Sequence, residues 1–294
     1  MRSVETASTV ERRSELTYAD DPRRVVRVRV EEPADRGRGE LALPCVIVLH
    51  GFKGFMDWGF FPEVSRRLAL AGFVAVSFNA SGSGIGEHPT ELTDEAGFAR
   101  HTFTRELEDI ERVADLARGL EGVDPERMGL LGHSRGGGMA LVHAVEAASY
   151  GAVVTWSAID SVDRFDESIK ERWRRQGYLL VHNARTGQDH RLDLEVLLDA
   201  ERNRDRLDVL AACRRSSTPT LVVHGTADES VEPAAAERIA AALPPGVGRL
   251  LAIPEAGHTF GARHPMREVP AALERALRAS VAHFREHLGQ GQGS

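Results

Sequence analysis

The stretch Arg127-Met-Gly-Leu-Leu-Gly-His-Ser-Arg-Gly-Gly-Gly-Met-Ala-Leu141 combines the patterns of a strand, a sharp turn and a helix. Residues 128–131 form a short apolar run typical of a buried strand, and apolar residues beyond the glycines recur at helical spacing. Between them lies Gly-His-Ser-Arg-Gly, a Gly-x-Ser-x-Gly motif in the strand-to-helix context that a nucleophile elbow requires. We therefore predict that Ser134 is an exposed nucleophile. An ordinary turn serine is the alternative, unless a base and an acid lie at neighbouring strand ends.

Composition limits the classes of protein to consider. The 294 residues are 42% hydrophobic, enough for one large α/β domain with an insertion. The net charge is -7, with cations interspersed among anions, so no nucleic-acid partner is expected. Cys45 and Cys213, the two cysteines, fit reduced, buried thiols. The first 21 residues lack the apolar core of a signal peptide and no later run could cross a membrane. We expect a cytoplasmic monomer or homodimer with no membrane partner.

Strand and helix patterns alternate along the chain. Residues 25–30 alternate between apolar and charged side chains, as in an antiparallel edge strand, and the later strand patterns are buried apolar runs. Such an order predicts an α/β fold, in which a mostly parallel central sheet has helices on both faces. The predicted parts are an N-terminal extension (1–24), a first core part (25–159), an inserted lid or cap (160–206), a second core part (207–288) and a flexible tail (289–294).

The insertion at residues 160–206 is polar and rich in Arg and Asp. It contains a helical segment around Trp173 and a predicted hairpin around Thr186-Gly187. An insertion of this size between core strands is often a lid over the site. Trp173, Tyr178 and Leu180 either line an acyl or aromatic pocket or hold the insertion to the core, and Trp58 has the same two interpretations.

The glycine-rich loop Ser81-Gly-Ser-Gly-Ile-Gly86 resembles a phosphate-binding loop only superficially. It lacks the full dinucleotide spacing and the Gly-Lys-Ser/Thr ending of a nucleotide loop. The histidines of the chain also lack the spacing of metal ligands. We therefore expect neither a cofactor nor a metal ion.

Two further strand ends carry candidates for an acid and a base. Asp228 follows the predicted strand at 220–224, and His258 follows the strand at 249–253. Because the carboxyl ends of parallel strands meet at one edge of a sheet, these side chains are expected to lie near Ser134. Their order along the chain, Ser, Asp and His, is the one expected of α/β-hydrolases.

The chain resembles α/β-hydrolases from about residue 25 to residue 288. More narrowly, it is similar to bacterial cinnamoyl or feruloyl esterase-like carboxylesterases. This similarity rests on four segments: His50-Gly51-Phe52, Gly132-His133-Ser134-Arg135-Gly136, His224-Gly225-Thr226-Ala227-Asp228 and Gly257-His258. The chain departs from those esterases in having Arg135 where they typically carry Gln.

The resemblance implies a cofactor-independent serine esterase. In it, Ser134 would be the nucleophile, His258 the general base and acid, and Asp228 the orienting carboxylate. The backbone N–H groups of Phe52 and Arg135 would form the oxyanion hole. The same roles follow from chemistry, since a serine hydroxyl needs an imidazole to take its proton and a carboxylate to stabilise the imidazolium.

Each assignment has a competitor. Glu229 is the alternative acid and His264 the alternative base. The other histidines at strand ends, His50, His133 and His224, are expected to support loops by hydrogen bonds. The side chain of Arg135 is expected to be solvated at the surface.

The function predicted from the sequence is hydrolysis of small to medium carboxylic esters through an acyl-enzyme, with hydroxycinnamate-type esters as candidate substrates. A peptidase of the prolyl-oligopeptidase type and an acyl thioesterase are alternatives that use the same triad. We expect the peptidase less, because about fifty residues precede the oxyanion loop, too few for the propeller that such peptidases usually carry. A non-catalytic binding protein on this scaffold would be expected to have lost a member of the triad.

Overall fold

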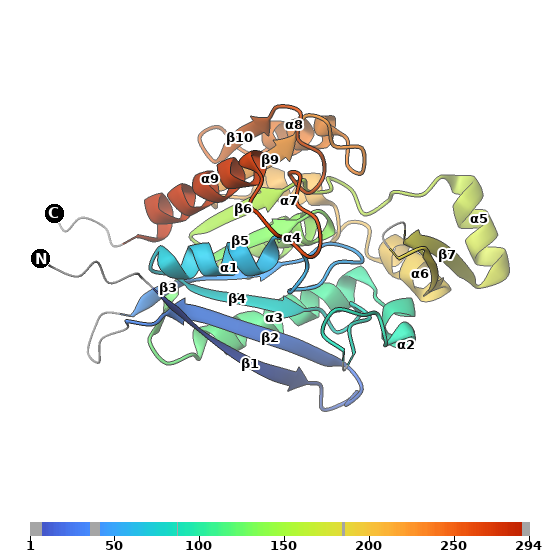
Figure 1. Cartoon of the computed structure of the whole chain (residues 1–294). Helices are drawn as coiled ribbons and strands as arrows, with labels where there is room; N and C mark the ends of the chain where they lie inside the picture. The colour runs from blue at the N-terminus through green and yellow to red at the C-terminus, as the bar shows by residue number, and fades with distance from the viewer. Residues whose placement is uncertain (1–7, 36–41, 87, 184–185, 290–294) are drawn as a thin grey trace, which may run out of the picture.

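A computed structural model of the chain describes residues 8–35, 42–86, 88–183 and 186–289. A twisted eight-stranded sheet runs through its centre, and an insertion extends from one end (Figure 1). The strand order is β1-β2-β4-β3-β5-β6-β9-β10, and a separate hairpin consists of β7 and β8. The six strands from β4 to β10 in this order are parallel, whereas β2 is antiparallel to both β4 and β1. The predicted α/β class and mostly parallel sheet are confirmed.

The strands of the central sheet are β1 (Thr9–Thr17), β2 (Val25–Pro33), β3 (Leu43–Leu49), β4 (Val74–Asn79), β5 (Val123–His133), β6 (Ala152–Trp156), β9 (Thr220–Gly225) and β10 (Gly248–Ile253), and the hairpin strands are β7 (Tyr178–Asn183) and β8 (Gln188–Asp193).

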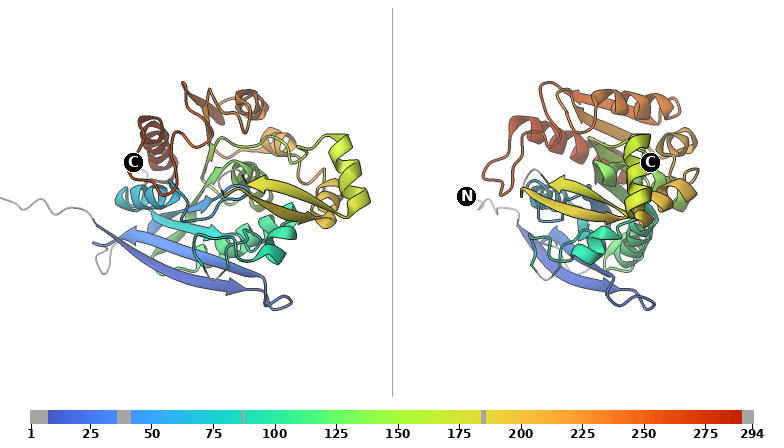
Figure 2. Two further views of the ribbon diagram at one scale, coloured as in Figure 1. Left: turned by 45° about the vertical axis from the view of Figure 1, so that its right-hand side comes forward. Right: turned by 90° about the vertical axis from the view of Figure 1, so that its right-hand side faces the viewer.

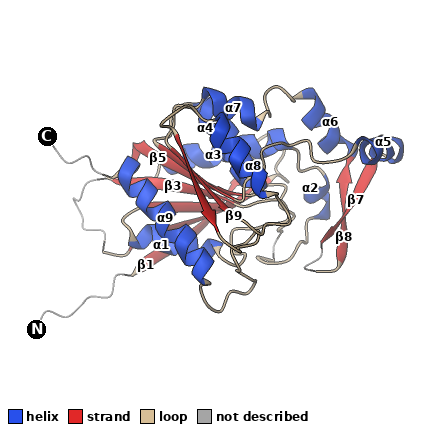
Figure 3. Cartoon of the chain, turned by 90° about the horizontal axis from the view of Figure 1, so that it is seen from above, coloured by secondary structure: helices blue, strands red, loops and turns tan. Residues whose placement is uncertain are grey.

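The helices of the described chain are α1 (Phe61–Leu70), α2 (Glu95–Ala99), α3 (Phe103–Arg118), α4 (Arg135–Ala147), α5 (Glu167–Gln176), α6 (Leu194–Arg202), α7 (Val209–Arg215), α8 (Pro233–Ala242) and α9 (Ala271–Leu288). Seen from above, α1 and α9 lie on one side of the sheet, and α3, α4, α7 and α8 lie on the other (Figure 3).

Each face of the sheet has its own hydrophobic core. One cluster joins the strands to α3, α4, α7 and α8, and the other joins them to α1 and α9. The central strands are therefore buried on both faces, which explains why β3 and β4 read as unbroken apolar runs. In the sheet, β4 lies on one side of β3 and β5 lies on the other, so the strand order reverses at β3. Ligands of such sheets bind beyond the strand ends at this reversal of strand order.

The N-terminal part of the sheet differs from the prediction. Residues Thr9–Thr17, within the segment predicted as an extension, form β1, which pairs antiparallel with β2 along its whole length. The edge strand is therefore β1, and the prediction that residues 25–30 form an edge strand is wrong. Most side chains of β1 are exposed and polar, so the sequence carries no apolar period there. Pairing of its main chain with that of β2 therefore determines the position of β1.

The insertion has a small core of its own. It consists of α5, the β7–β8 hairpin and α6, which extend beyond the end of the sheet (Figure 2). The predicted hairpin is confirmed, with Tyr178 opposite Asp193 and Asn183 opposite Gln188. Trp173, Leu179 and other apolar side chains of the insertion pack against Phe98 of α2. The insertion thus packs against α2, and α6 also contacts α3.

Several predictions concern residues outside the described ranges. These include residues 1–7 of the predicted extension, residues 290–294 of the predicted tail and two residues of the hairpin turn, 184–185. Among described residues, Cys45 and Cys213 are free and buried, as predicted. None of the helices in the described ranges is long and apolar enough to span a bilayer.

Candidate active site

The elbow at Ser134 has the strained geometry that the motif requires. Ser134 lies between β5 and α4 with φ of 56° and ψ of -120°, outside the regions that non-glycine residues usually adopt. A Cβ atom at Gly132 would come within 2.3 Å of the carbonyl oxygen of Gly136, so only glycine fits there. The N–H of Ser134 donates to the carbonyl of Trp156 at 2.8 Å, which ties the elbow to β6. The strain is therefore held by the neighbouring strand, and Ser134 remains partly exposed.

Asp228 and His258 meet beyond the ends of β9 and β10. Nδ1 of His258 lies 2.8 Å from Oδ2 of Asp228, the distance of a charge-assisted hydrogen bond. The two loops are joined by the N–H of Ala227, which donates to the carbonyl of Ala256 at 2.9 Å. Asp228 is buried, whereas His258 is only partly buried. The predicted acid and base are thus in direct contact.

The carboxylate of Asp228 is held in its ionised form. Burial alone would raise the pKa of Asp228, but hydrogen bonds from His224 and His258 and from the N–H of Val231 outweigh it and hold this pKa below its ordinary value. Oδ1 also accepts from the N–H of Ser230 at 2.9 Å. Both carboxylate oxygens of Asp228 therefore accept hydrogen bonds, which fixes the plane of the carboxylate.

The other strand-end histidines serve as supports. Nε2 of His133 lies 3.0 Å from the carbonyl oxygen of His258, and Nε2 of His224 lies 2.9 Å from that of Val231. Nε2 of His50 accepts from the N–H of Ala80 at 3.2 Å. Burial lowers the pKa of His50 to about 4, so this ring is neutral at physiological pH. These contacts agree with the loop-supporting roles predicted for the three residues.

The geometry does not favour the competing acid and base. The side chain of Glu229 is exposed, and the imidazole of His258 faces Asp228 instead. Nδ1 of His264 accepts from the N–H of Gly59 at 3.0 Å, and its ring stacks on Trp58 with 6.4 Å between centroids. His264 therefore orders the loop before α1.

The predicted oxyanion residues flank Ser134. A Cβ atom at Gly51 would lie 2.8 Å from the Cβ of Ser134, so glycine lets the loop after β3 contact the elbow. Phe52 follows in that loop, and Arg135 begins α4. Within the described residues, neither backbone N–H of this pair has an intramolecular acceptor. Free N–H groups beside a nucleophile are the donors that an oxyanion needs.

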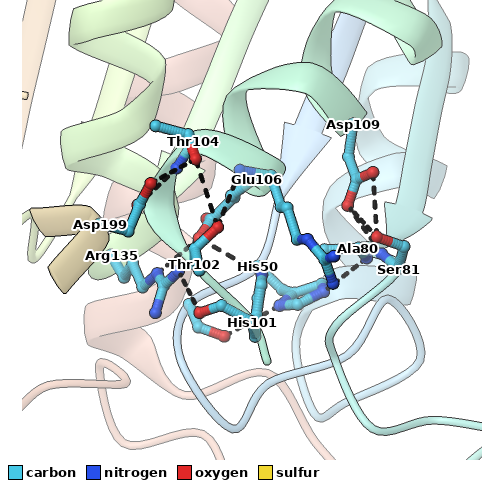
Figure 4. A network of polar contacts seen from close by, with 12 residues as sticks. His50, Ala80, Ser81, His101, Thr102, Thr104, Glu106, Asp109, Arg135 and Asp199 are labelled. Carbon is cyan, nitrogen blue, oxygen red and sulfur yellow. Dashed lines mark hydrogen bonds and ion pairs between the residues drawn. The ribbon is translucent and has the colours of Figure 1, made fainter. Parts of the chain in front are cut away.

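The side chain of Arg135 contradicts the prediction of a solvated surface group. It is 6% exposed, and its Nε donates to Oε2 of Glu106 on α3 at 2.5 Å. Its Nη2 donates to the carbonyl of His101 at 3.2 Å, and its guanidinium lies 4.0 Å from the ring centroid of Phe103. Figure 4 shows Arg135, Glu106 and His101 within this network. Arg135 is therefore a structural cation of the site.

Sequence reasoning missed the acidic partners of this network. Neither Glu106 nor Asp109 is named among the residues predicted from the sequence, yet these residues of α3 are 4% and 0% exposed. Both precede Ile110 and Val113 at helical spacing, so they share the buried stripe. Carboxylates on an apolar stripe need buried partners, here Arg135 and Arg24. That spacing was the signal available in the sequence.

The four predicted substrate-binding residues occupy different environments. Trp58 is buried between Phe60 and His264, in the core beneath α1 and α9. Trp173 is 1% exposed in the core of the insertion, which agrees with a packing role. Tyr178 is half-buried beneath the guanidinium of Arg191, and Leu180 is 54% exposed.

One cluster in the described ranges has the composition of a metal site but is already satisfied. His283, Glu286 and His287 on α9 place ligand atoms within 4.8 Å of one another. However, Nη2 of Arg249 lies 3.2 Å from Nδ1 of His283 and 2.8 Å from Glu286. The guanidinium takes the place that a cation would need.

Comparison with known sequences relates the chain to hydrolases. A family model described as the prolyl oligopeptidase family matches residues 58–289. A curated relative, 2,6-dihydropseudooxynicotine hydrolase from Paenarthrobacter nicotinovorans, is 27% identical over 190 residues. This alignment covers 63% of the chain and 44% of the relative. The chain therefore spans less than half the length of this relative.

Comparison with solved structures concerns the fold. Est1E from Butyrivibrio proteoclasticus, also solved with ferulic acid bound, has a TM-score of 0.67 at 19% identity, covering 95% of this chain and 99% of its own. A puromycin-hydrolysing peptidase from Mycobacterium tuberculosis has a TM-score of 0.67 at 20% identity, covering 96% of this chain and 40% of its own. The predicted α/β-hydrolase fold is confirmed.

Proposed function

The chain belongs to the prolyl oligopeptidase family and is a hydrolase of the α/β-hydrolase fold, and from this premise we propose that it cleaves small to medium carboxylic esters through an acyl-enzyme. The proposed catalytic residues are Ser134, His258 and Asp228. The observation that carries the proposal is the 2.8 Å contact between His258 and the buried Asp228, at the strand ends beside the strained elbow of Ser134.

In the proposed acylation step, Oγ of Ser134 attacks the ester carbonyl carbon while Nε2 of His258 takes the hydroxyl proton. The carbonyl electron pair moves onto oxygen, which the N–H groups of Phe52 and Arg135 stabilise. The intermediate then collapses, the C–O bond to the alcohol breaks, and His258 returns its proton to the leaving alkoxide. Water repeats the sequence on the acyl-enzyme and releases the acid.

The environment of Asp228 supports this assignment. An imidazolium forms at His258 in both steps, and a carboxylate stabilises it only while ionised. The lowered pKa of Asp228 keeps that charge across the neutral range. The carboxylate also fixes the tautomer of His258, because Nδ1–H donates to it and leaves Nε2 free to accept the serine proton.

Hydroxycinnamate-type esters are the proposed substrates within the ester class. The supporting observations are the shared fold with Est1E, a protein solved with ferulic acid, and the half-buried ring of Phe52 beside the elbow. A small-molecule ester needs no protein partner. A peptidase is the second candidate, because the matching family is named for oligopeptidases. An acyl thioesterase would use the same residues.

A substrate panel tests the proposal and separates the alternatives. The wild type and Ser134→Ala would be assayed with p-nitrophenyl esters of graded acyl length, methyl ferulate, an acyl thioester and an aminoacyl p-nitroanilide. We expect ester turnover that Ser134→Ala abolishes. Turnover of the anilide or the thioester alone would assign the enzyme to the corresponding alternative. A folded protein that does not react with a serine-directed phosphonate would be a binding protein.

A further inference from the structure

The insertion contacts the first turn of α3 through a buried carboxylate. Asp199 of α6 is 6% exposed, and its Oδ2 accepts from the N–H of Thr104 at 3.1 Å. Its Oδ1 accepts from the hydroxyl of Thr104 at 2.5 Å and from Nδ2 of Asn203 at 3.1 Å. Thr104 is the second residue of α3, so one turn of this helix is fastened to the insertion.

The same turn of α3 carries the partner of an oxyanion residue. Glu106 lies two residues after Thr104, and its carboxylate holds the guanidinium of Arg135. In Figure 4, dashed lines join Asp199 to Thr104 and Glu106 to Arg135, and both pairs meet on the first turn of α3. Because Arg135 is the first residue of α4, its side chain links α3 to the start of that helix.

A second contact joins the insertion to the other oxyanion residue. The ring of Phe52 stacks on Phe98 of α2 with 5.3 Å between centroids, and the apolar side chains of the insertion pack against Phe98. Phe98 in turn lies 5.3 Å from the ring of His190 on β8. The next residue of the oxyanion loop, Lys53, donates from Nζ to the carbonyl of His182 on β7 at 2.8 Å.

We infer that the insertion is a brace that holds the two oxyanion N–H groups in place, with Asp199 and Glu106 as positioning residues. This inference rests on the proposed function, and it differs from the prediction of a lid. Two separate contacts, one through α3 and one through the loop after β3, reach the two sides of the elbow. A group of hydrogen-bond donors stabilises an oxyanion only when it is held rigidly before the reaction.

The test uses Asp199→Asn and Thr104→Val in the full-length protein, assayed with p-nitrophenyl butyrate. Asn places an N–H₂ group against one donor of Thr104, and Val removes the hydroxyl while keeping its shape. Loss of one oxyanion donor costs about 100-fold to 1,000-fold in kcat, so displacing one is expected to cost about tenfold. We expect KM to change less than twofold. Glu195→Gln is the matched control, since its carboxylate is exposed on the same helix.

A transition-state analogue distinguishes positioning from general stability. A trifluoromethyl ketone forms an oxyanion on Ser134, so its Ki should rise about tenfold in both variants, in step with kcat/KM. Unchanged kcat and Ki in folded Asp199→Asn and Thr104→Val would overturn the inference. A lower Tm with an unchanged Ki would also overturn it. If Asp199→Asn does not fold, Thr104→Val decides. Ester turnover by Ser134→Ala would instead contradict the proposed function itself.

Discussion

Replacing Asp228 with asparagine tests the proposed triad most directly, because the structure fixes how the new side chain would sit. The N–H groups of Ser230 and Val231 donate to Oδ1 at 2.9 and 3.0 Å, so the amide oxygen of Asn is expected to stay there. The amide N–H₂ then faces Nδ1 of His258, where Oδ2 is now 2.8 Å away. Two donors cannot share this contact, so His258 adopts the tautomer with the proton on Nε2.

That tautomer cannot accept the serine proton. The expected loss in kcat is about 10⁴-fold, or about 5.5 kcal/mol of transition-state stabilisation. KM should change little, because Asn keeps the volume of Asp. The thermal midpoint should fall, because the amide N–H₂ also faces Nε2 of His224, which is 3.3 Å from Oδ2 and buried. The assay is hydrolysis of p-nitrophenyl acetate at neutral pH, with rates normalised to the concentration of folded protein, because phosphonate labelling depends on the same base.

Glu229→Gln is the matched control. Glu229 follows Asp228 directly, is exposed, and is the alternative acid considered from the sequence. Its kcat should stay within about twofold of the wild type, as for an exposed surface substitution. A full loss in Glu229→Gln together with an active Asp228→Asn would refute the assignment of the acid.

Three further predictions concern stability and the elbow. Burial lowers the pKa of His143 to about 4, so as pH falls this imidazole is protonated at a lower pH in the folded state than in the unfolded chain. The stability contributed by His143 is complete above about pH 6.5 and decreases by about 3 kcal/mol toward pH 4. Because other buried histidines such as His50 titrate in the same sense, urea unfolding of wild type should lose about 3 kcal/mol more over this range than unfolding of His143→Gln. Gly132→Ala places a Cβ 2.3 Å from the carbonyl oxygen of Gly136 and should reduce phosphonate labelling of Ser134 at least tenfold. Unchanged labelling would show that the turn relaxes without harm to the elbow. Trp173→Ala should destabilise the insertion by about 3–5 kcal/mol in hydrogen exchange, whereas Leu180→Ser should have no effect; equal effects would contradict the packing role of Trp173.

Short-range patterns predicted much of this molecule. The elbow is encoded by glycines on both sides of Ser134, and the buried parallel strands by unbroken apolar runs. The proximity of Asp228 and His258 followed from a general rule, since parallel strands end at one edge of a sheet. None of these inferences required knowledge of which side chain contacts which.

The features that sequence reasoning missed depend on long-range partners. The Arg135 side chain is buried because Glu106, 29 positions earlier, faces it across α3 and α4. The β1 strand has no apolar period, because its main chain is placed by pairing with β2. Likewise, the sequence gives no sign that Asp199 on the amphipathic helix α6 is buried, because its partner Thr104 lies 95 positions away. In each case the partner is invisible within a local window.

The charged edge formed by β1 restricts how copies of the protein can associate. Its outer side offers free main-chain groups, which in other sheets recruit a strand from a second molecule. A two-fold antiparallel pairing centred on Arg13 would place Arg13 opposite itself and Glu11 opposite Glu15. Shifting the centre to lie between Arg12 and Arg13 opposes two arginines again. Like charges directly opposite weaken strand pairing, so these two registers of β1 against a second copy are disfavoured.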